Sequence, residues 1–414
     1  MNGICRGEAT LPTAQQTRLG WILSGNVKTF QCNVVINNLD EIQKFWEIED
    51  IKDASELSLE DEQCLKFYKD TTTRREDGRY EVRLPLKPGY EEKLGESKSK
   101  AIAQFCQLEK KINKQPKTLE SYKLFIHEYL ELGHMTTASG NSTPNCYLPH
   151  HCVRREDSTT TKLRVVFNAS AITSSGMSLN DLMFRGPNLQ HDLQDLIIKW
   201  RQYKYAYTAD LEKMFRQIWL HTEDQNLQKI IWRDSHRDRL REYQLATVTY
   251  GTKAAPFLAM MTLKQLAHDE KLNYLESLAP EVLENSFYMD DLVHGSHTPE
   301  EAKGLQADLI NILSSGGFNI RKWKSNLPEM LEGVNSDSPT QGYDFKQAES
   351  AKTLGLRWNP GADQFTFQLQ IPLTTARPTK RSLLSDTSKL FDPLGWLSPI
   401  TIKLKILFQD VWKA

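Results

Sequence analysis

The stretch "FYMDDLVH" at residues 287–294 places two adjacent carboxylates, Asp290 and Asp291, between an aromatic-methionine run and a short apolar run. Apolar residues on both sides of a pair of aspartates predict two short strands joined by a tight turn. Neighbouring carboxylates repel and raise each other's pKa, so a chain that keeps both ionised beside buried residues usually provides a shared cation. A solvated turn without a ligand is the alternative. The fold must therefore explain a doubled charge at the end of a hairpin.

The chain has 414 residues, enough for more than one domain, with 39% apolar and 25% charged residues, as is typical of globular proteins. Its formal net charge is −1, so a nucleic-acid partner would have to be held by local clusters of cations. No apolar stretch approaches the length of a membrane span, and the N-terminus lacks the apolar core of a signal peptide. We therefore expect an intracellular protein that does not contact membranes.

Six cysteines are spaced irregularly along the chain, which is unlike a disulfide-stapled secreted domain and predicts reduced thiols. The tightest group is "CYLPHHC", from Cys146 to Cys152 with His150 and His151. These are zinc-ligand types without the usual paired spacing. A strand that enters a core is the preferred interpretation, with zinc as the alternative.

Helices and strands are expected in a mixed α+β order rather than in strict βαβ alternation. Apolar spacing predicts two helices over 98–132, split near Pro116 with lysines clustered around the break. "EKMFRQIWL" (212–220) reads as an amphipathic helix, and 298–317 as a helix with an acidic first turn that ends at two glycines. Residues 40–88 read as a connector with little core of its own.

A third carboxylate, Asp210, ends the alternating strand "YKYAYTAD", in which Lys204, Ala206 and Thr208 share its face. If that strand pairs beside the 287–294 hairpin, three carboxylates converge. Three hard oxygen ligands suit two Mg²⁺ ions about 3.5 to 4 Å apart, the arrangement used for in-line phosphoryl transfer. A helix N-cap is the alternative role for Asp210 taken alone.

Five motifs in order resemble the palm motifs of reverse transcriptases. They are Asp210 with Phe215, "YGTKAAP" (250–256), "YMDD" (288–291), "GFNIRKWKSN" (317–326) and "TLGLRW" (353–358). Among these enzymes, the sequence most resembles those of Bel/Pao-class retrotransposons. The stretches that carry the resemblance are "YLELGHM", "YLPHHCVRREDSTTTKLRVVFNAS" and "KLFDPLGWLSPITIKLKILFQDVW". The resemblance implies an α+β right-hand polymerase fold of fingers, palm and thumb with an antiparallel palm sheet.

The same resemblance implies a division of the chain into six segments. These are the tail of a retropepsin-like domain (1–25), a connector (26–95), N-terminal helices and fingers (96–200), palm (201–330), primer-grip hairpins (331–372) and thumb helices (373–414). Residues from about 352 onward resemble a region labelled Pao retrotransposon peptidase. The chain has no Asp-Thr-Gly or Asp-Ser-Gly triplet, so aspartic protease activity is not expected.

Catalytic roles follow from the resemblance residue by residue. Asp210, Asp290 and Asp291, with the backbone carbonyl of Leu211, match ligands of two Mg²⁺ ions, for which Mn²⁺ is a substitute. Lys322 matches a lysine that protonates the leaving pyrophosphate. Arg321 and Lys324 lie so close in the sequence that the resemblance does not fix which of the three residues takes this role. The alternative for "RKWK" is a basic strand that follows a phosphate backbone.

Substrate-binding roles are implied in the same way. The expected nucleotide contacts are Arg155, Lys162 or its competitor Arg164, Phe215, Tyr250 and Gly251. Phe215 would exclude a ribose 2′-hydroxyl, with a core aromatic stacked on Trp219 as the alternative. The expected primer and template contacts are Tyr288, Met289, Leu354, Gly355, Arg357 and Trp358.

The sequence thus predicts a retrotransposon reverse transcriptase that uses an RNA template, a DNA primer and dNTPs, in the cytoplasm within virus-like particles of the parent element. The protease, RNase H and integrase of a complete polyprotein are not expected in this chain. One alternative is a catalytically silent or domesticated remnant that binds nucleic acid, since Asn168 stands where the family usually has aspartate. A template-directed RNA polymerase is a second alternative, which Phe215 disfavours.

Overall fold

The computed structural model describes residues 57–138, 143–154, 163–332, 334, 351–353, 356–367, 379–388, 390 and 392–413, with three short strands before them. The chain forms two units, Met1–Glu56 and Leu57–Ala414. The first contains an antiparallel sheet of β1 (Ile4–Cys5), β2 (Thr13–Thr17) and β3 (Gly20–Ser24). The strand expected at 30–36 lies outside the described residues.

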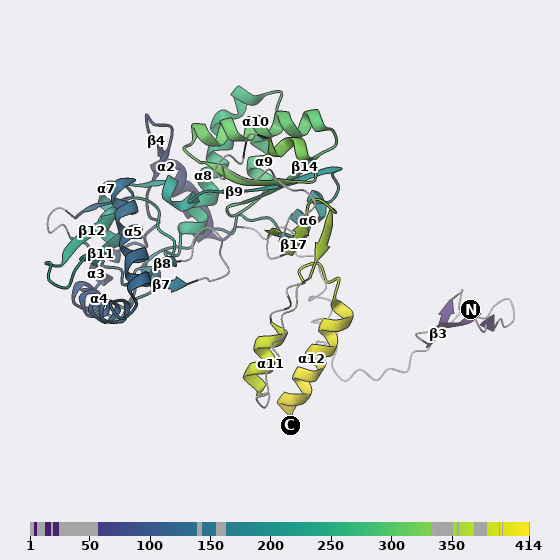
Figure 1. Ribbon diagram of the computed structural model, residues 1–414, viewed down its shortest axis with the longest axis horizontal. Helices are drawn as coiled ribbons and strands as arrows, with labels where there is room; N and C mark the ends of the chain where they lie inside the picture. The colour runs from purple at the N-terminus through teal and green to yellow at the C-terminus, as the bar shows by residue number, and fades with distance from the viewer. Residues whose placement is uncertain are drawn as a thin grey trace. The chain divides into compact units, whose positions relative to one another are not determined.

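A four-stranded antiparallel sheet is the centre of the second unit (Figure 1). Its order is β13 (Phe287–Tyr288), β14 (Asp291–Ser296), β9 (Tyr205–Leu211) and β15 (Ile320–Ser325). The 287–294 stretch is a hairpin, and the strand that ends in Asp210 pairs directly beside it. The predicted antiparallel sheet is confirmed.

Alternate residues of β9 enter two different apolar clusters, because successive side chains of a strand point to opposite faces. Tyr207, Ala209 and Leu211 join the larger cluster, and Ala206 joins a smaller one. The helices α8 (Ala255–Glu270), α9 (Ala279–Asn285) and α10 (Pro299–Ser315) cover the first face, whereas α6 (Leu193–Trp200) and β17 (Leu356–Asn359) cover the second (Figure 1). The second face is covered over only part of its length, and there the site lies.

The helix expected after residue 298 is present as α10, and its ends follow the predicted signals. The Thr298 side chain accepts a hydrogen bond from the Glu301 backbone, and the Glu301 carboxylate accepts one from the Thr298 backbone. The chain leaves the helix through Gly316 and through Gly317, which has a φ of +76°. This reciprocal capping satisfies amides that a helix start leaves free.

Residues 57–95 are part of the core, so the prediction of a connector there is wrong. They form α2 (Leu59–Thr71), β4 (Thr73–Arg74), β5 (Tyr80–Val82) and α3 (Tyr90–Lys93). Tyr68 and Tyr80 are buried, and the Tyr68 hydroxyl is 3.0 Å from the Thr262 hydroxyl of α8. The Tyr68 contact joins residues 194 positions apart in the chain, which local patterning cannot indicate.

The region before the palm holds the two predicted helices, α4 (Lys98–Ile112) and α5 (Pro116–Glu131). Pro116 is the first residue of α5, where a missing amide costs nothing. The helices accompany a sheet of β11 (Lys229–Trp232), β12 (Arg241–Leu245) and β6 (Met135–Thr137), and a hairpin of β7 (His150–Arg154) and β8 (Leu163–Phe167). The preferred interpretation of "CYLPHHC" is confirmed, since His150 begins a strand and is buried.

The prediction of an amphipathic helix over residues 212–220 is wrong. The chain instead forms a short 3₁₀ turn, η2 (Met214–Gln217), followed by β10 (Trp219–Leu220). Strand β10 pairs in parallel with β5, and the Leu220 amide donates to the Ala246 carbonyl at 2.9 Å. Backbone hydrogen bonds to distant segments have overridden the local helical spacing.

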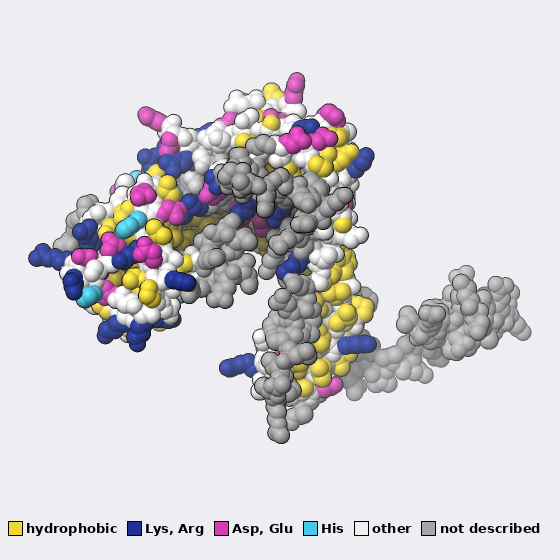
Figure 2. Space-filling view, viewed as in Figure 1, with side chains coloured by type: hydrophobic (Ala, Val, Ile, Leu, Met, Phe, Trp, Pro, Cys, Tyr) yellow, Lys and Arg dark blue, Asp and Glu magenta, His cyan; other side chains and the backbone are white. Residues whose placement is uncertain are grey.

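The C-terminal part contains the two helices expected there, α11 (Lys380–Thr387) and α12 (Ser398–Lys413), which contact each other. They follow the antiparallel strands β16 (Ala351–Thr353), β17 and β18 (Gln364–Thr366). Figure 2 shows hydrophobic side chains along the C-terminal helices, and Ile400, Ile402 and Trp412 are each about half exposed. No helix in the described ranges is long and apolar enough to cross a membrane.

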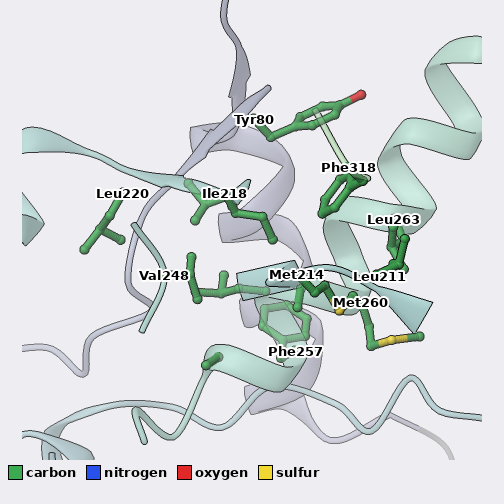
Figure 3. Close-up of a cluster of buried hydrophobic side chains, with 14 of the residues drawn as sticks. Tyr80, Leu211, Met214, Ile218, Leu220, Val248, Phe257, Met260, Leu263 and Phe318 are labelled. Carbon is green, nitrogen blue, oxygen red and sulfur yellow. The ribbon is translucent and has the colours of Figure 1, made fainter. Parts of the chain in front are cut away.

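The larger core joins segments of the second unit between Cys64 and Leu331, and Figure 3 shows part of it. Tyr80, Leu220 and Phe257 come from β5, β10 and α8, and Figure 3 draws them in one cluster with Leu211 of β9 and Phe318. The remaining short elements are η1 (Asn180–Leu182), α7 (Thr222–Gln225), η3 (Asn226–Gln228), η4 (Lys271–Tyr274) and η5 (Pro328–Leu331). This core supports one face of β9, and the smaller cluster packs against part of the other face.

Candidate active site

The hairpin between β13 and β14 has a two-residue turn. Tyr288 pairs with Asp291, so Met289 and Asp290 form the turn, and Met289 has a φ of +56°. A positive φ at the first turn residue matches the twist of tight hairpins but is uncommon for a residue with a side chain. The turn therefore holds the two aspartates in a constrained geometry at the end of the sheet.

The register of β14 on β9 brings the third carboxylate beside these two. Asp291 lies directly opposite Asp210, and the Leu211 amide donates to the Asp290 carbonyl at 2.8 Å. Opposite residues of an antiparallel pair have side chains on the same face. Asp210, Asp290 and Asp291 thus gather at one end of the palm sheet, as the sequence predicted.

The electrostatics of the group reflect burial and mutual repulsion. Burial, then the negative charges of Asp290 and Asp210, raise the pKa of Asp291 to about 7. The pKa of Asp290 is also raised, first by burial and then by Asp210, although Arg164 and Lys322 oppose the rise. Burial and the neighbouring negative charges thus outweigh the nearby cations in setting both pKa values.

Lys322 is the cation that reaches the carboxylates. Between Arg321 and Lys324 the strand β15 carries a β-bulge, and Lys322 has a φ of +53°. Its ammonium Nζ lies 3.2 Å from Oδ2 of Asp210, whereas Arg321 Nε lies 3.0 Å from Oε2 of Glu212. Lys324 is partly buried, and desolvation lowers its pKa. The bulge thus settles which neighbour contacts Asp210, a choice that the sequence left open.

The donor chemistry of the three carboxylates fits Mg²⁺, which prefers hard oxygen ligands. Within the described ranges, however, no three His, Cys, Asp or Glu side chains are already arranged around a common point as ligands. The Lys322 ammonium stands beside Asp210 in the position of a counter-cation. Metal binding at Asp210, Asp290 and Asp291 would thus require this lysine and the carboxylates to adjust.

The zinc alternative for "CYLPHHC" is not supported. The ring of His150 contacts the Tyr122 hydroxyl through Nδ1 and lies 3.0 Å from the Ile231 carbonyl through Nε2. Both ring nitrogens therefore have partners within the core. Burial lowers the pKa of His150 to about 4 and keeps the ring neutral.

Arg164 is the candidate triphosphate cation that the structure describes, because Arg155 and Lys162 lie outside the described residues. Arg164 is exposed, its Cζ lies 5.1 Å from the centroid of the Tyr250 ring, and its charge lowers the pKa of Asp290. Arg164 thus lies on the side of the hairpin that faces the carboxylates.

Tyr250 and Gly251 hold a loop against strand β8. The Tyr250 hydroxyl donates to the Val165 carbonyl at 2.6 Å. Gly251 has a φ of +102°, and a Cβ there would lie 2.2 Å from the Phe167 carbonyl oxygen. Only glycine fits this position. The structure gives both residues a role in positioning the loop, and their nucleotide contacts remain a prediction.

Phe215 is half-buried against the larger core in the η2 turn. The predicted stack on Trp219 is absent from the ring contacts of the described residues, because Trp219 belongs to β10 and carries Arg75 and Arg79 over its ring, 4.8 and 4.6 Å from the centroid. The stacking alternative is therefore wrong. Packing and sugar exclusion both remain open for Phe215.

The residues expected at the primer differ in exposure. Tyr288 is partly exposed beside the second apolar cluster, and Met289 is partly exposed in the hairpin turn. Trp358 is fully buried against Trp200, with ring centroids 4.8 Å apart, so its side chain packs β17 onto the palm and offers no surface to a primer. Arg357 is partly exposed, and Leu354 and Gly355 lie outside the described residues.

Sequence reasoning missed Asn180, which positions the loop around Gly251. Its amide nitrogen donates to the Gly251 carbonyl at 3.0 Å, and its amide oxygen accepts from the Lys253 backbone at 2.8 Å. The residue begins the short 3₁₀ helix η1, 71 and 73 positions from its partners, and no local signal indicates it. Asn168 caps a turn by accepting from the Ser170 amide at 3.1 Å.

An antiparallel palm sheet that presents three carboxylates defines the class as a template-directed polymerase fold. Residues 157–358 match the family described as reverse transcriptase (RNA-dependent DNA polymerase), and residues 379–414 match the Pao retrotransposon-like RNaseH-like domain. The chain therefore contains a reverse transcriptase region, with a Pao retrotransposon-like segment after it. The second description names an RNaseH-like domain where the sequence resemblance suggested a peptidase label.

Two solved structures are similar to this chain. The foamy viral protease-reverse transcriptase dRH in complex with ds DNA is 17% identical, with a TM-score of 0.48, over 70% of this chain and 43% of that one. The selenomethionine-labelled prototype foamy virus protease-reverse transcriptase CSH mutant is 19% identical, with a TM-score of 0.38, over 50% of this chain and 24% of that one. The chain thus spans less than half of either neighbour. No curated protein sequence matches it.

Proposed function

We propose that the chain catalyses RNA- and DNA-templated DNA synthesis from dNTPs. The observation that carries the proposal is the register that sets Asp291 opposite Asp210, with Asp290 in the adjoining turn. A structural hairpin has no need of three carboxylates at one point. A reaction that moves negative phosphoryl groups between metal-bound oxygens does need them.

Asp210, Asp290 and Asp291 would hold two Mg²⁺ ions, which when bound supply an activated primer 3′-hydroxyl and a stabilised leaving pyrophosphate. The chain's own contribution is a group of oxygen donors that the strand register brings to one end of the sheet. The Lys322 ammonium, 3.2 Å from Asp210, is close enough to exchange this partner for the leaving group and give it a proton. This assignment favours Lys322 over Arg321, whose guanidinium is held by Glu212.

The nucleotide would be held between the hairpin of β7 and β8 and the palm. Arg164, with Arg155 and Lys162, would neutralise charge that moves onto the leaving phosphates. Phe215 would lie under the sugar, and the Tyr250–Gly251 loop would shape the pocket through its fixed contact with β8. On the primer side, Tyr288 and Arg357 are partly exposed at the hairpins expected to position the 3′ end.

Primer extension on an RNA template and on a DNA template tests the proposal, with and without Mg²⁺. We expect metal-dependent synthesis on both templates. Absence of extension above a metal-free blank, from protein shown to be folded, would contradict it.

A silent, nucleic-acid-binding remnant is the second candidate, favoured by one feature. Asn168 occupies a position that the family usually gives to aspartate, and here it only caps a turn. This candidate predicts that primer-template binds and that no metal restores synthesis. Asn168→Asp separates the two readings, since recovery of extension in that variant alone would show recent decay of an active enzyme.

A further inference from the structure

The end of α4, the turn after it and the start of α5 carry four lysines that the proposed reaction does not use. Lys110, Lys111, Lys114 and Lys117 fall within eight residues, and all four are exposed. None forms a salt bridge with another described residue. No acidic residue stands between them in the chain. Residues 110–117 therefore carry four positive charges that no acidic residue within the stretch compensates.

A second basic segment is fixed to the same place by one ion pair. Arg233, at the end of β11, makes two hydrogen bonds to the carboxylate of Glu109, at 2.8 and 2.6 Å, one residue before Lys110. The loop that follows Arg233 carries exposed Arg237 and Arg239 and leads into β12, whose first residue, Arg241, is also exposed. The pairing thus anchors the β11–β12 loop to the end of α4.

The nearby acids do not cancel this charge. Glu109 is already neutralised by Arg233. Asp234 is engaged by His127, 3.2 Å away, and by the indole nitrogen of Trp232 at 3.0 Å. Exposed Asp238 and Glu120 stand against seven exposed cations, in a chain whose net charge is −1. The clustering is therefore local rather than a property of the whole surface.

This surface, the α4–α5 and β11–β12 basic surface, belongs to different elements from the carboxylate site. Figure 1 shows α4 and β11 grouped apart from β9 and β14 within the second unit, and Figure 2 shows Lys and Arg side chains gathered over α4. The two segments contain no Phe, Tyr or Trp, and the exposed His236 is the one aromatic ring in them. Such a surface is suited to phosphates rather than to stacked bases.

We propose that the α4–α5 and β11–β12 basic surface binds the sugar-phosphate backbone of a nucleic-acid strand outside the polymerase cleft. A strand of polyanion matches two adjoining cationic segments on neighbouring elements. A protein partner is disfavoured, because lysine is depleted in protein interfaces and the surface lacks an apolar centre. The proposal does not depend on catalysis.

The test uses the full chain and a variant in which Lys110, Lys111, Lys114 and Lys117 are each replaced by Gln. Affinity is measured over a series of salt concentrations for single-stranded RNA and single-stranded DNA of about 30 nucleotides, long enough to reach beyond one cleft. Each lost phosphate contact should reduce the slope of log affinity against log salt by roughly 0.7. We expect a slope smaller by about two to three, and at least tenfold weaker binding at low salt.

A matched control replaces Lys66, Lys69, Lys93 and Lys271 by Gln, which removes equal charge from exposed positions elsewhere. We expect the control to bind both strands like the unmodified chain. An equal loss in both variants would overturn the proposal, since only total charge would then matter. An unchanged salt slope in the Lys110–Lys117 variant would also overturn it.

Two further readouts keep the interpretation separate from the polymerase proposal. Extension of a short hairpin primer-template, which fills only the cleft, should proceed equally in the variant and the unmodified chain. If neither extends the primer, the polymerase proposal fails while the binding result still stands. Competition by polyglutamate as strong as by RNA of equal charge would overturn the proposal in favour of an acidic protein partner.

Discussion

The carboxylate end of the palm sheet and the α4–α5 and β11–β12 basic surface concentrate opposite charges in opposite ways. In the palm, backbone register and a strained turn place Asp210, Asp290 and Asp291 side by side, and burial together with like charge raises the pKa of Asp291 to about 7. On the basic surface, long flexible side chains lie in solvent. Metal chemistry needs fixed donors, whereas phosphate binding needs only charge density.

The two regions also differ in what lies beneath them. Below the basic surface, Tyr122, His150 and Trp232 form an aromatic core, in which Tyr122 and Trp232 stack with ring centroids 5.0 Å apart. The three carboxylates instead lie at the turn end of the palm hairpin, where each is at least partly exposed. Changes in the palm should therefore affect chemistry more than stability, and changes near His150 should do the reverse.

The largest expected effect is on chemistry in the palm. Replacing Asp290→Asn or Asp291→Asn should lower the rate of synthesis about a thousandfold, because each change removes one metal ligand from the transition state. Primer-template affinity and melting temperature should change little, since cations bind the phosphates. Single-turnover extension and an equilibrium binding assay measure the two quantities.

The exposed residue Asp195 of α6 provides a control, because Asp195→Asn removes the same charge away from the hairpin. That variant should retain full activity. If Asp290→Asn or Asp291→Asn kept a tenth of the activity, that result would contradict the assignment of these residues as metal ligands.

The next effect concerns stability near His150. The pKa of His150 is about 4 in the folded state, below its ordinary value of 6.5. Between these two pH values the imidazole is therefore protonated in the unfolded state and neutral in the folded state. Stability should fall as the pH drops from about 6.5 to about 4, by up to about 3 kcal/mol from this residue. Chemical denaturation at both ends of this range measures it.

His150→Gln should reduce that loss, whatever it does to stability at neutral pH. His294 of β14, whose pKa burial also lowers to about 4, provides the palm counterpart. It is partly exposed, so His294→Gln should remove less of the acid sensitivity. Equal acid sensitivity in the unmodified chain and both variants would show that neither histidine is held neutral.

A smaller effect separates sugar exclusion from packing at Phe215. If the ring lies under the nucleotide sugar, Phe215→Val should raise the ratio of rNTP to dNTP incorporation about tenfold, a relative barrier change of about 1.4 kcal/mol. The neighbouring Ile218→Val should lower the melting temperature without changing the ratio, because Ile218 is fully buried. An unchanged ratio with a lower melting temperature in Phe215→Val would assign the ring to packing.

The smallest effect tests the loop at Tyr250. Tyr250→Phe removes the hydroxyl that donates to Val165 and should cost about 1 kcal/mol of stability. A fall in dNTP affinity beyond the matched variant Tyr68→Phe, which loses a hydroxyl contact to Thr262 away from the site, would show a direct role in the pocket. Equal affinity in both would restrict Tyr250 to holding the loop.

Several parts of the fold could be predicted because their signals are local. The hairpin at 287–294 follows from apolar residues around two turn-forming aspartates, and α10 follows from Thr298, Glu301 and the closing glycines. The break at Pro116 follows from the missing amide of proline. In each case, the interactions that decide the structure join residues a few positions apart.

Other parts could not be predicted because their partners are remote. Strand β10 has the spacing of an amphipathic helix but pairs with β5, more than 130 residues earlier. Tyr68 and Tyr80 lie in a polar stretch. They become buried only when the chain folds and the larger core, which includes α8, packs around them. Asn180 has no sequence signature, because its function depends on two backbone groups of a later loop.

By itself, the sequence determined the identity and order of the palm motifs, the three carboxylates and the alternation that gives Asp210 its face. Tertiary structure alone decided that Asp291 lies opposite Asp210, that the bulge in β15 delivers Lys322 to them, and that Trp358 is buried. Side-chain type and local periodicity are written in the chain, but register, bulges and burial depend on which distant segments exchange hydrogen bonds and apolar contacts.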